Sequence, residues 1–258
     1  MRFTFFKPLH GWRALVGEVA IIVIGVLIAL AAEQAVQNWR WNQDAHAALE
    51  QLREESSSNF FYAAERVVVQ PCLAAQLDRL EERVLNSGPI LTPAPAIEAK
   101  IGAQAYRQPT ARPWATDIYE SIVADGVASH FRREARPTLS NFYAQIETLK
   151  ALAKASDTAT AQLTVMLSPI PLDSGARERI VMIIAEERAR TGVIANDSVQ
   201  NMASLTLLGQ APPTADIEKL LDGSGTIKYC RERSLPLADW RRSLAEQLTD
   251  GRQPQRLI

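Results

Sequence analysis

The sequence predicts an all-α protein in which an N-terminal transmembrane helix continues into an antiparallel helical bundle. A long apolar run lies near the N-terminus, and apolar residues recur at helical spacing through most of the remaining chain. Aromatic residues make up only 7%, whereas Ala, Leu, Glu, Arg and Gln are abundant, which favours helices over sheets. Hydrophobic residues at 47% are enough for a packed core. The net charge of −1 lacks the basic bias of nucleic-acid-binding proteins, so no nucleic-acid partner is expected.

The apolar run is residues 14–32, ALVGEVAIIVIGVLIALAA, and its only charged residue is Glu18. As a helix this run is roughly 28 Å long, which matches the ~30 Å hydrocarbon core of a bilayer. The alternative is a buried helix of a soluble protein, but such helices seldom run this long without a polar face. We therefore predict a transmembrane helix over residues 14–33, with the lipid bilayer as its partner.

The flanking residues predict the orientation of this helix. Residues 1–13 contain Arg2, Lys7 and Arg13 and no acidic residue, so the positive-inside rule places them in the cytoplasm. Trp12 at one end and Trp39 and Trp41 beyond the other suit the headgroup regions. The predicted organisation is a cytoplasmic tail (1–13), a transmembrane helix (14–33), an extracytoplasmic helical domain (34–250) and a C-terminal tail (251–258). The expected location is the inner (cytoplasmic) membrane, with the domain in the periplasm.

A cleavable signal peptide is an alternative interpretation of the same segment. Ala29-Leu30-Ala31 fits the small-x-small pattern of a cleavage site. However, the helical pattern continues through Trp39 without Pro or Gly, which favours a retained anchor. Both interpretations place the domain outside the cytoplasm.

Three residues of the predicted span form a candidate contact face for a second membrane helix. Glu18, Gly25 and Ala29 lie within about 40° of one another around a helix. Gly25 and Ala29 are a small-xxx-small pair, which lets another helix approach closely. The second helix would come from a membrane-protein partner or from another copy in a homodimer. Alternatively, Glu18 lies about one turn inside Arg13 and only reaches the headgroups.

Parts of the chain resemble an uncharacterised family of bacterial single-pass membrane proteins. Trp12-Arg13-Ala14 and the run from Gly17-Glu18 to Leu30 are similar to the family's opening segment, W-R followed by G-E and an apolar stretch. Gln37-Asn38-Trp39 is similar to its polar-Asn-Trp exit from the membrane, and residues 119–143 resemble its central helix-turn-helix stretch. The resemblance covers residues 12–41 and 114–143. It implies a membrane-anchored helical protein, and it supplies no activity and no catalytic residues.

The extracytoplasmic domain is predicted to consist mainly of helices. The first continues from the membrane to Val69 with a possible kink at residues 56–59, and Pro71 begins a second one that ends at Asn86. Residues 88–113 contain many prolines and predict a loop. Further helices are expected over residues 114–131 with a break at Gly126, from Pro137 to before Ser168, over 175–208 with a possible division at Gly192, and over 236–248.

Cys72 and Cys230 are the only cysteines. An even number of cysteines in an exported domain predicts a disulfide, and two buried reduced thiols are the alternative. The absence of a C-x-x-C motif argues against redox catalysis.

The sequence offers no motif for a cofactor, a metal or a catalytic residue. His10, His46 and His130 are far apart, and no H-E-x-x-H or Cys/His cluster occurs. The carboxylate pairs 54–55, 81–82 and 186–187 are expected on solvated helix faces, because adjacent helical residues do not face one another. Tyr119, Asp125 and His130 are expected to serve packing and capping rather than to line a pocket.

These observations favour an interaction, scaffold or sensory module of the cell envelope without catalytic activity. A small-ligand-binding domain, which would need an apolar cavity between helices, is an alternative. An anchored envelope hydrolase, which would need a cleft of clustered polar residues with shifted pKa values, is another.

Overall fold

The computed structural model describes residues 12–99, 102–109, 114–248, 255, 257 and 258. The described helices are α1 (Trp12–Asn86), α2 (Asp117–Ala124), α3 (Arg136–Leu163), α4 (Ser174–Leu207), α5 (Thr214–Asp222), α6 (Gly225–Glu232) and α7 (Trp240–Leu248). Two 3-10 turns, η1 (Val127–His130) and η2 (Thr164–Leu167), and one antiparallel hairpin of β1 (Ile97–Ala99) and β2 (Gly102–Gln104) complete these elements. The all-α prediction is confirmed.

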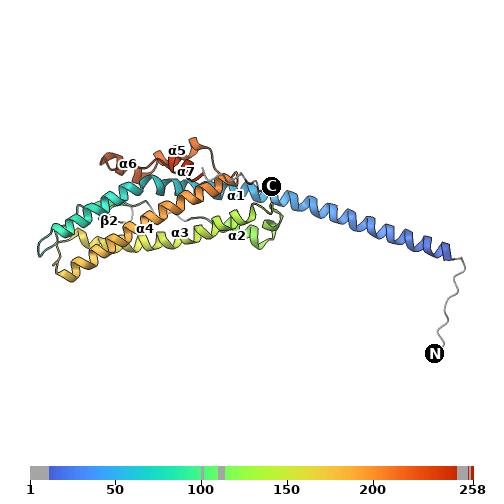
Figure 1. Cartoon of the computed structure of the whole chain (residues 1–258), viewed down its shortest axis with the longest axis horizontal. Coiled ribbons are helices and arrows are strands. Elements are labelled where there is room, and N and C mark those ends of the chain that lie inside the picture. The colour runs from blue at the N-terminus through green and yellow to red at the C-terminus, as the bar shows by residue number, and fades with distance from the viewer. Residues whose placement is uncertain (1–11, 100–101, 110–113, 249–254, 256) are drawn as a thin grey trace, which may run out of the picture.

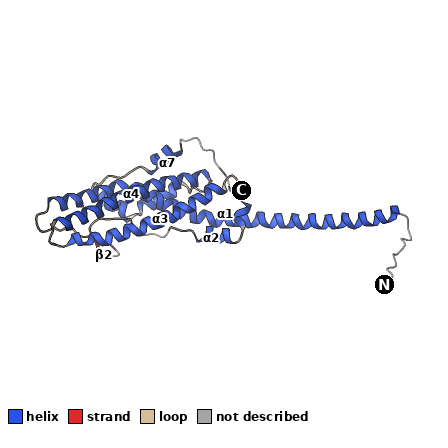
Figure 2. Cartoon of the chain, turned by 60° about the horizontal axis from the view of Figure 1, so that its bottom comes forward, coloured by secondary structure: helices blue, strands red, loops and turns tan. Residues whose placement is uncertain are grey.

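Helix α1 dominates the shape of the molecule. It contains 75 residues and is therefore about 110 Å long. Its N-terminal part projects alone from the bundle, and its C-terminal part is one of the long helices of the bundle (Figures 1 and 2). The apolar run and the domain are thus joined by one unbroken helix, as the sequence predicts.

The expected start of a second helix at Pro71 is wrong, because α1 continues through residues 56–59 and through Pro71. A proline inside a helix costs about 3 kcal/mol in isolation. Here the surrounding side chains of Val69, Cys72 and Leu73 are no more than 2% exposed, so burial offsets that cost. The side chain of Asn59 exchanges two hydrogen bonds with the backbone of Ala115, so it does not compete for the backbone of its own helix.

The bundle is built on α1, α4 and α3. Arg188 of α4 pairs with Asp78 and Glu81 of α1, and Arg177 reaches the carbonyl of Val84, so these two helices run antiparallel. Helix α3 packs on the other side of α4 (Figure 1). Helices α5 and α6 cover a further face of α1, and α7 packs mainly on α4 and reaches α1 where Trp240 meets Phe60 edge to face. Fully buried core side chains come from all three long helices, including Leu52, Leu77, Phe142, Ile146 and Ile184.

The remaining helix boundaries mostly follow the sequence. Gly126 has a φ of 76° and ends the helical stretch that begins at Asp117, as predicted. Gly192 does not divide α4, which is a single helix, so that suggested division is wrong. Helix α7 begins at Trp240, four residues later than the sequence predicts.

Candidate functional site: the projecting part of α1 and its junction with the bundle

The projecting part of α1 has no contact with the bundle. From Leu15 to Arg40 every side chain is exposed, and the first buried side chain along α1 is Ala45. The most apolar 18-residue window of this helix has a mean hydropathy of 2.7, and 0% of it is buried. By length and composition this segment is able to cross a membrane. Arg2 and Lys7, on which the predicted orientation depends, lie outside the described residues.

The three residues of the candidate contact face lie on this projecting part. Glu18, Gly25 and Ala29 are all exposed, and Glu18 has no hydrogen bond or ion pair with any residue that the structure describes. A Cβ added at Gly25 would meet no atom within 4 Å. The face is therefore open along the helix, while its association with a second helix stays a prediction.

A stalk separates the apolar run from the bundle. Ala32 and Ala45 are about 20 Å apart along the helix axis. Val36 and Trp39, the large apolar side chains of this stalk, are 50% and 60% exposed. At 100° per residue both lie on the same side of α1 as Gly25.

The first side chains of α1 that the bundle buries lie on the side of the helix opposite Gly25. They are Ala45, Ala48, Leu49 and Leu52, and all four lie about 120–180° around the helix from Gly25. Glu50 and Glu54, on the same side as Gly25, remain exposed. The side that carries Gly25 and Trp39 is thus uncovered up to the beginning of the bundle.

Two aromatic rings stack where the stalk of α1 meets the bundle. The indole of Trp41 lies against the imidazole of His130, with 4.2 Å between ring centroids and 14° between planes. Nearby, Leu257 is 2% exposed, and its carbonyl accepts a hydrogen bond of 2.8 Å from the amide of Arg132. His130 therefore has a packing role, as predicted, and the end of the chain lies at the base of the bundle.

Glu55 joins α1 to α2 and α3. Its carboxylate accepts hydrogen bonds from the backbone amide of Ile118 (2.9 Å) and from the hydroxyl of Tyr143 (2.6 Å). Burial raises the pKa of Tyr143, and the hydrogen bond to Glu55 raises it further. The ring of Tyr119 stacks on Tyr143 at 3.9 Å. Tyr119 therefore packs in the core while it lines one side of a small surface hollow.

Glu187 lies at the centre of a second buried polar cluster. It is 0% exposed, accepts a 2.9 Å hydrogen bond from the hydroxyl of Tyr106, and forms an ion pair with Arg190. Burial raises the pKa of Tyr106, and the charge of Glu187 adds to this rise. The expectation that all three carboxylate pairs are solvated is wrong, because Glu55 and Glu187 are buried. In these two pairs, helical geometry turns one carboxylate inward, and the sequence alone does not show which one.

A third buried carboxylate fixes the C-terminal helices to α1. Glu65 is 4% exposed and accepts a hydrogen bond from the hydroxyl of Ser224, which also caps α6 through the amide of Ile227. The neighbouring Arg66 is attracted by Glu65, Asp157 and Glu187, while burial lowers its pKa. These charges link α1 with α3, α4 and α6.

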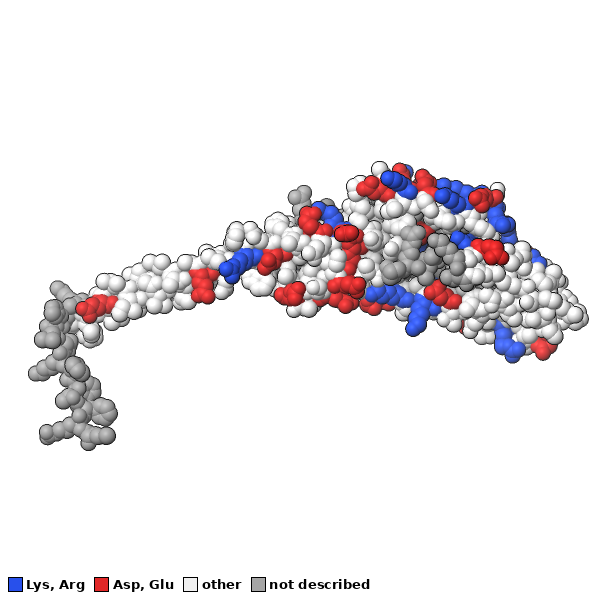
Figure 3. All heavy atoms as spheres, turned by 180° about the vertical axis from the view of Figure 1, so that it is seen from behind, with Lys and Arg blue, Asp and Glu red and all other residues white. Residues whose placement is uncertain are grey.

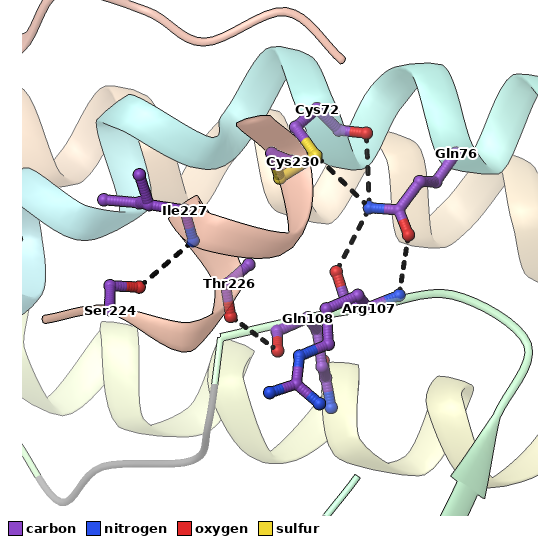
Figure 4. The surroundings of a disulfide bond; sticks show 8 residues. All are labelled: Cys72, Gln76, Arg107, Gln108, Ser224, Thr226, Ile227 and Cys230. Atoms are coloured by element: carbon purple, nitrogen blue, oxygen red, sulfur yellow. Dashed lines mark hydrogen bonds between the residues drawn. A yellow bond between two sulfur atoms is a disulfide. The ribbon is translucent and has the colours of Figure 1, made fainter. Parts of the chain in front are cut away.

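The predicted disulfide between Cys72 and Cys230 is present and joins α1 to α6. Figure 4 shows Gln76 beside it, bonded through its amide to the backbone of Arg107 in both directions. The hydroxyl of Thr226 in α6 donates a hydrogen bond to the carbonyl of Gln108, the residue after Arg107. The disulfide and these polar contacts together attach α6 and residues 106–108 to α1.

Charge is unevenly distributed over the surface. Acidic side chains gather where α1 enters the bundle, whereas the far end of the bundle carries few charges on the face shown (Figure 3). The exposed acidic residues of α1 and α2 in this part include Glu50, Glu54, Asp117 and Glu120. On the face shown, the bundle is therefore acidic where it meets the stalk.

The buried carboxylates do not line either of two grooves of the described surface. A polar groove between α3, α4 and α7 has a volume of about 150 Å³ and is lined by residues such as Asn141 and Gln200. A hollow beside Phe61 and α5 measures about 480 Å³. Among the residues described, no group of three or more His, Cys, Asp or Glu side chains is arranged to hold a metal ion. The projecting part of α1 and its junction therefore remain the candidate site.

Comparison with protein-family models, with curated proteins and with solved structures finds no match for this chain.

Proposed function

We propose that this chain is a membrane-anchored, non-catalytic interaction module of the cell envelope. Residues 14–33 span the inner membrane with the N-terminus in the cytoplasm, and the bundle lies in the periplasm. The helix contacts other membrane components, and the bundle holds a folded surface outside the bilayer. Membership of the bacterial single-pass family rests on the segments 12–41 and 114–143 and is part of the same proposal.

One observation carries this proposal: the apolar segment, the stalk and a core helix of the bundle are a single helix, α1. Between the apolar segment and the first buried residues of the bundle this helix contains no proline, so its backbone hydrogen bonds connect the two without interruption. The disulfide supports an oxidising compartment for the bundle. An enzyme or a ligand-binding protein needs only a tether, whereas a scaffold or transmitting module uses a rigid connection.

The anchoring is tested first. Membranes that contain the full-length protein are extracted with alkaline carbonate, and spheroplasts are treated with a protease. We expect the protein to stay in the membrane pellet and the periplasmic bundle to be accessible to external protease in intact spheroplasts. Release by carbonate, or protection of the bundle until the cells are lysed, would contradict the proposed anchor or its orientation.

The interaction is tested by purification from membranes in mild detergent. The full-length chain is compared with a Glu18→Leu/Gly25→Leu variant, and Ala20→Leu on the opposite side of the helix is the matched control. We expect a specific membrane partner with the unmodified chain and with the control, and loss of that partner from the double variant. Identical results for the three proteins would exclude a contact through this face.

A further inference from the structure

One side of α1 forms a continuous surface from the membrane segment to the bundle. At 100° per residue its members fall within a sector about 100° wide. Six of them are Glu18, Ile22, Gly25, Ala29, Val36 and Trp39. Ile21, Ala32 and Arg40 lie in the same sector, and all nine residues are exposed. We call the first six residues the α1 contact face. It adds large apolar side chains of the stalk to the small residues of the membrane segment.

The bundle does not obstruct this face. The buried residues Ala45, Leu49 and Leu52 lie on the other side of α1, and the first buried side chain in line with Gly25 is Phe61. A second helix is therefore free to lie against α1 inside the membrane and along the whole stalk.

Glu18 determines what kind of helix fits there. It is the only charged residue in the segment 14–32. A carboxylate at this depth is costly in hydrocarbon unless a cation or a hydrogen-bond donor compensates it. Gly25 and Ala29 allow the backbone of a second helix to come close, which brings a cation on that helix within a short distance of the carboxylate.

Within the segment 14–32, a second copy of this chain supplies no cation. Copies of one protein insert in the same orientation, so a symmetric pair would place Glu18 opposite Glu18 at the same depth. Two like charges in a medium of low dielectric constant repel each other. The charge of the face is complementary to a basic residue on another protein.

We propose that the α1 contact face binds a transmembrane helix of a different membrane protein, which carries a Lys or Arg at the depth of Glu18. This inference rests on the proposed function, because it names the partner of the same membrane helix. The apolar side chains of Val36 and Trp39 then pack against the continuation of the partner helix outside the membrane.

The test uses the labelled full-length chain in phosphatidylcholine vesicles with two synthetic transmembrane helices. Both probes consist of leucine and alanine, and they differ in one residue, which is Lys or Leu at a depth that matches Glu18. Association is measured by energy transfer between labels. We expect the Lys probe to bind at least ten-fold more strongly than the Leu probe.

Three variants locate the contact. Glu18→Gln removes the charge and should reduce binding of the Lys probe about ten-fold, toward the level of the Leu probe. Gly25→Leu keeps the charge but blocks close approach, and it should weaken binding of the Lys probe several-fold. Ala20→Leu adds the same bulk on the opposite side and should leave binding unchanged.

Each outcome decides between the alternatives. Equal binding of both probes, no effect of Glu18→Gln, or self-association of labelled chains stronger than binding of the Lys probe would overturn the inference. Retention in carbonate-washed membranes is measured on the same preparations. A protein that stays in the membrane but does not distinguish the probes refutes only this inference, whereas a protein that is released refutes the proposed function.

Discussion

The two parts of α1 differ in what surrounds them, although they belong to one helix. Between residues 15 and 40 every side chain is exposed, and the segment carries a single charge in its apolar run. Between Ala45 and Val84 apolar side chains are buried by α2 to α7, and even Glu55 and Glu65 are inside. By length and composition the apolar run of the first part suits a solvent that is itself apolar, whereas the second part creates an apolar interior from its own neighbours.

This difference shows how one helix can have two kinds of partner. A helix that is apolar on all sides can be stable in lipid, because its backbone hydrogen bonds are satisfied within the helix. The bundled part is apolar on some sides only, and it tolerates Pro71 and buried carboxylates because the protein supplies their surroundings. Substitutions in the two parts should therefore have different effects on the unfolding of the bundle.

The largest effect on the stability of the bundle is expected at Glu187, the buried carboxylate of α4. Glu187→Ala removes the ion-pair partner of Arg190 and one of the two hydrogen-bond partners of the Tyr106 hydroxyl, which keeps Thr160, so it should destabilise the bundle by about 3–5 kcal/mol. Glu186→Ala, next to it on the exposed side, should change stability by no more than about 0.5 kcal/mol. Urea unfolding of the full-length protein in detergent, followed by circular dichroism, measures both. Equal midpoints would show that the buried cluster contributes nothing.

Two leucines of α1 compare the two parts directly. Leu52 is 0% exposed and Leu27 is 59% exposed. Leu52→Ala should lower the free energy of unfolding by about 2–5 kcal/mol through lost burial and a cavity. Leu27→Ala should leave the unfolding midpoint of the bundle unchanged in the same detergent. A shift of similar size for Leu27→Ala would mean that the projecting part also takes part in the packed fold.

The disulfide belongs to the packed part alone. The bond closes a sequence separation of 158 residues, and the chain-entropy model gives about 5 kcal/mol as an upper limit for its contribution. A Cys72→Ala/Cys230→Ala variant should lose about 2–4 kcal/mol, the range usual for such bonds. The unmodified protein under reducing conditions should match this variant, and the variant itself should not respond to the reductant. A variant as stable as the oxidised protein would show that the contacts of Glu65 and Gln76 hold α6 without the bond.

The smallest expected effect on stability tests where along α1 the bundle begins. Trp41 stacks on His130, whereas Trp39, two residues earlier, is 60% exposed. Trp41→Ala should destabilise the bundle by about 0.5–1.5 kcal/mol, the usual contribution of an aromatic pair. Trp39→Ala should not change bundle unfolding, while on the proposed contact face it should weaken binding of a partner. Loss of stability from Trp39→Ala would move the border of the bundle toward the N-terminal end of α1.

Several features of the fold were predictable because they depend on local sequence. The apolar segment, the break at Gly126, the ends of α1 and α3, and the pairing of two lone cysteines follow from composition, spacing and turn residues. The role of His130 as a packing residue also agrees with the expectation, although the sequence does not reveal Trp41 as its partner.

Other features depend on residues distant in the chain and were wrong or missed. Pro71 was expected to start a helix because its ring lacks an amide hydrogen, but burial around Cys72 keeps α1 continuous. Glu186 and Glu187 have the same chemistry, and only the position of α4 against Tyr106 decides which one is buried. A single sequence contains no signal for that choice.

The sequence by itself determined the all-α class, the membrane-compatible segment and the single pair of cysteines. These depend on helical propensity, on the length of an apolar run and on a count, all of which are properties of neighbouring residues. Only the tertiary structure decided that α1 is uninterrupted, which carboxylates are buried, and which side of the stalk remains free. Those features arise when segments far apart in the chain pack together, because burial and hydrogen bonding at one residue depend on the neighbours that the fold brings to it.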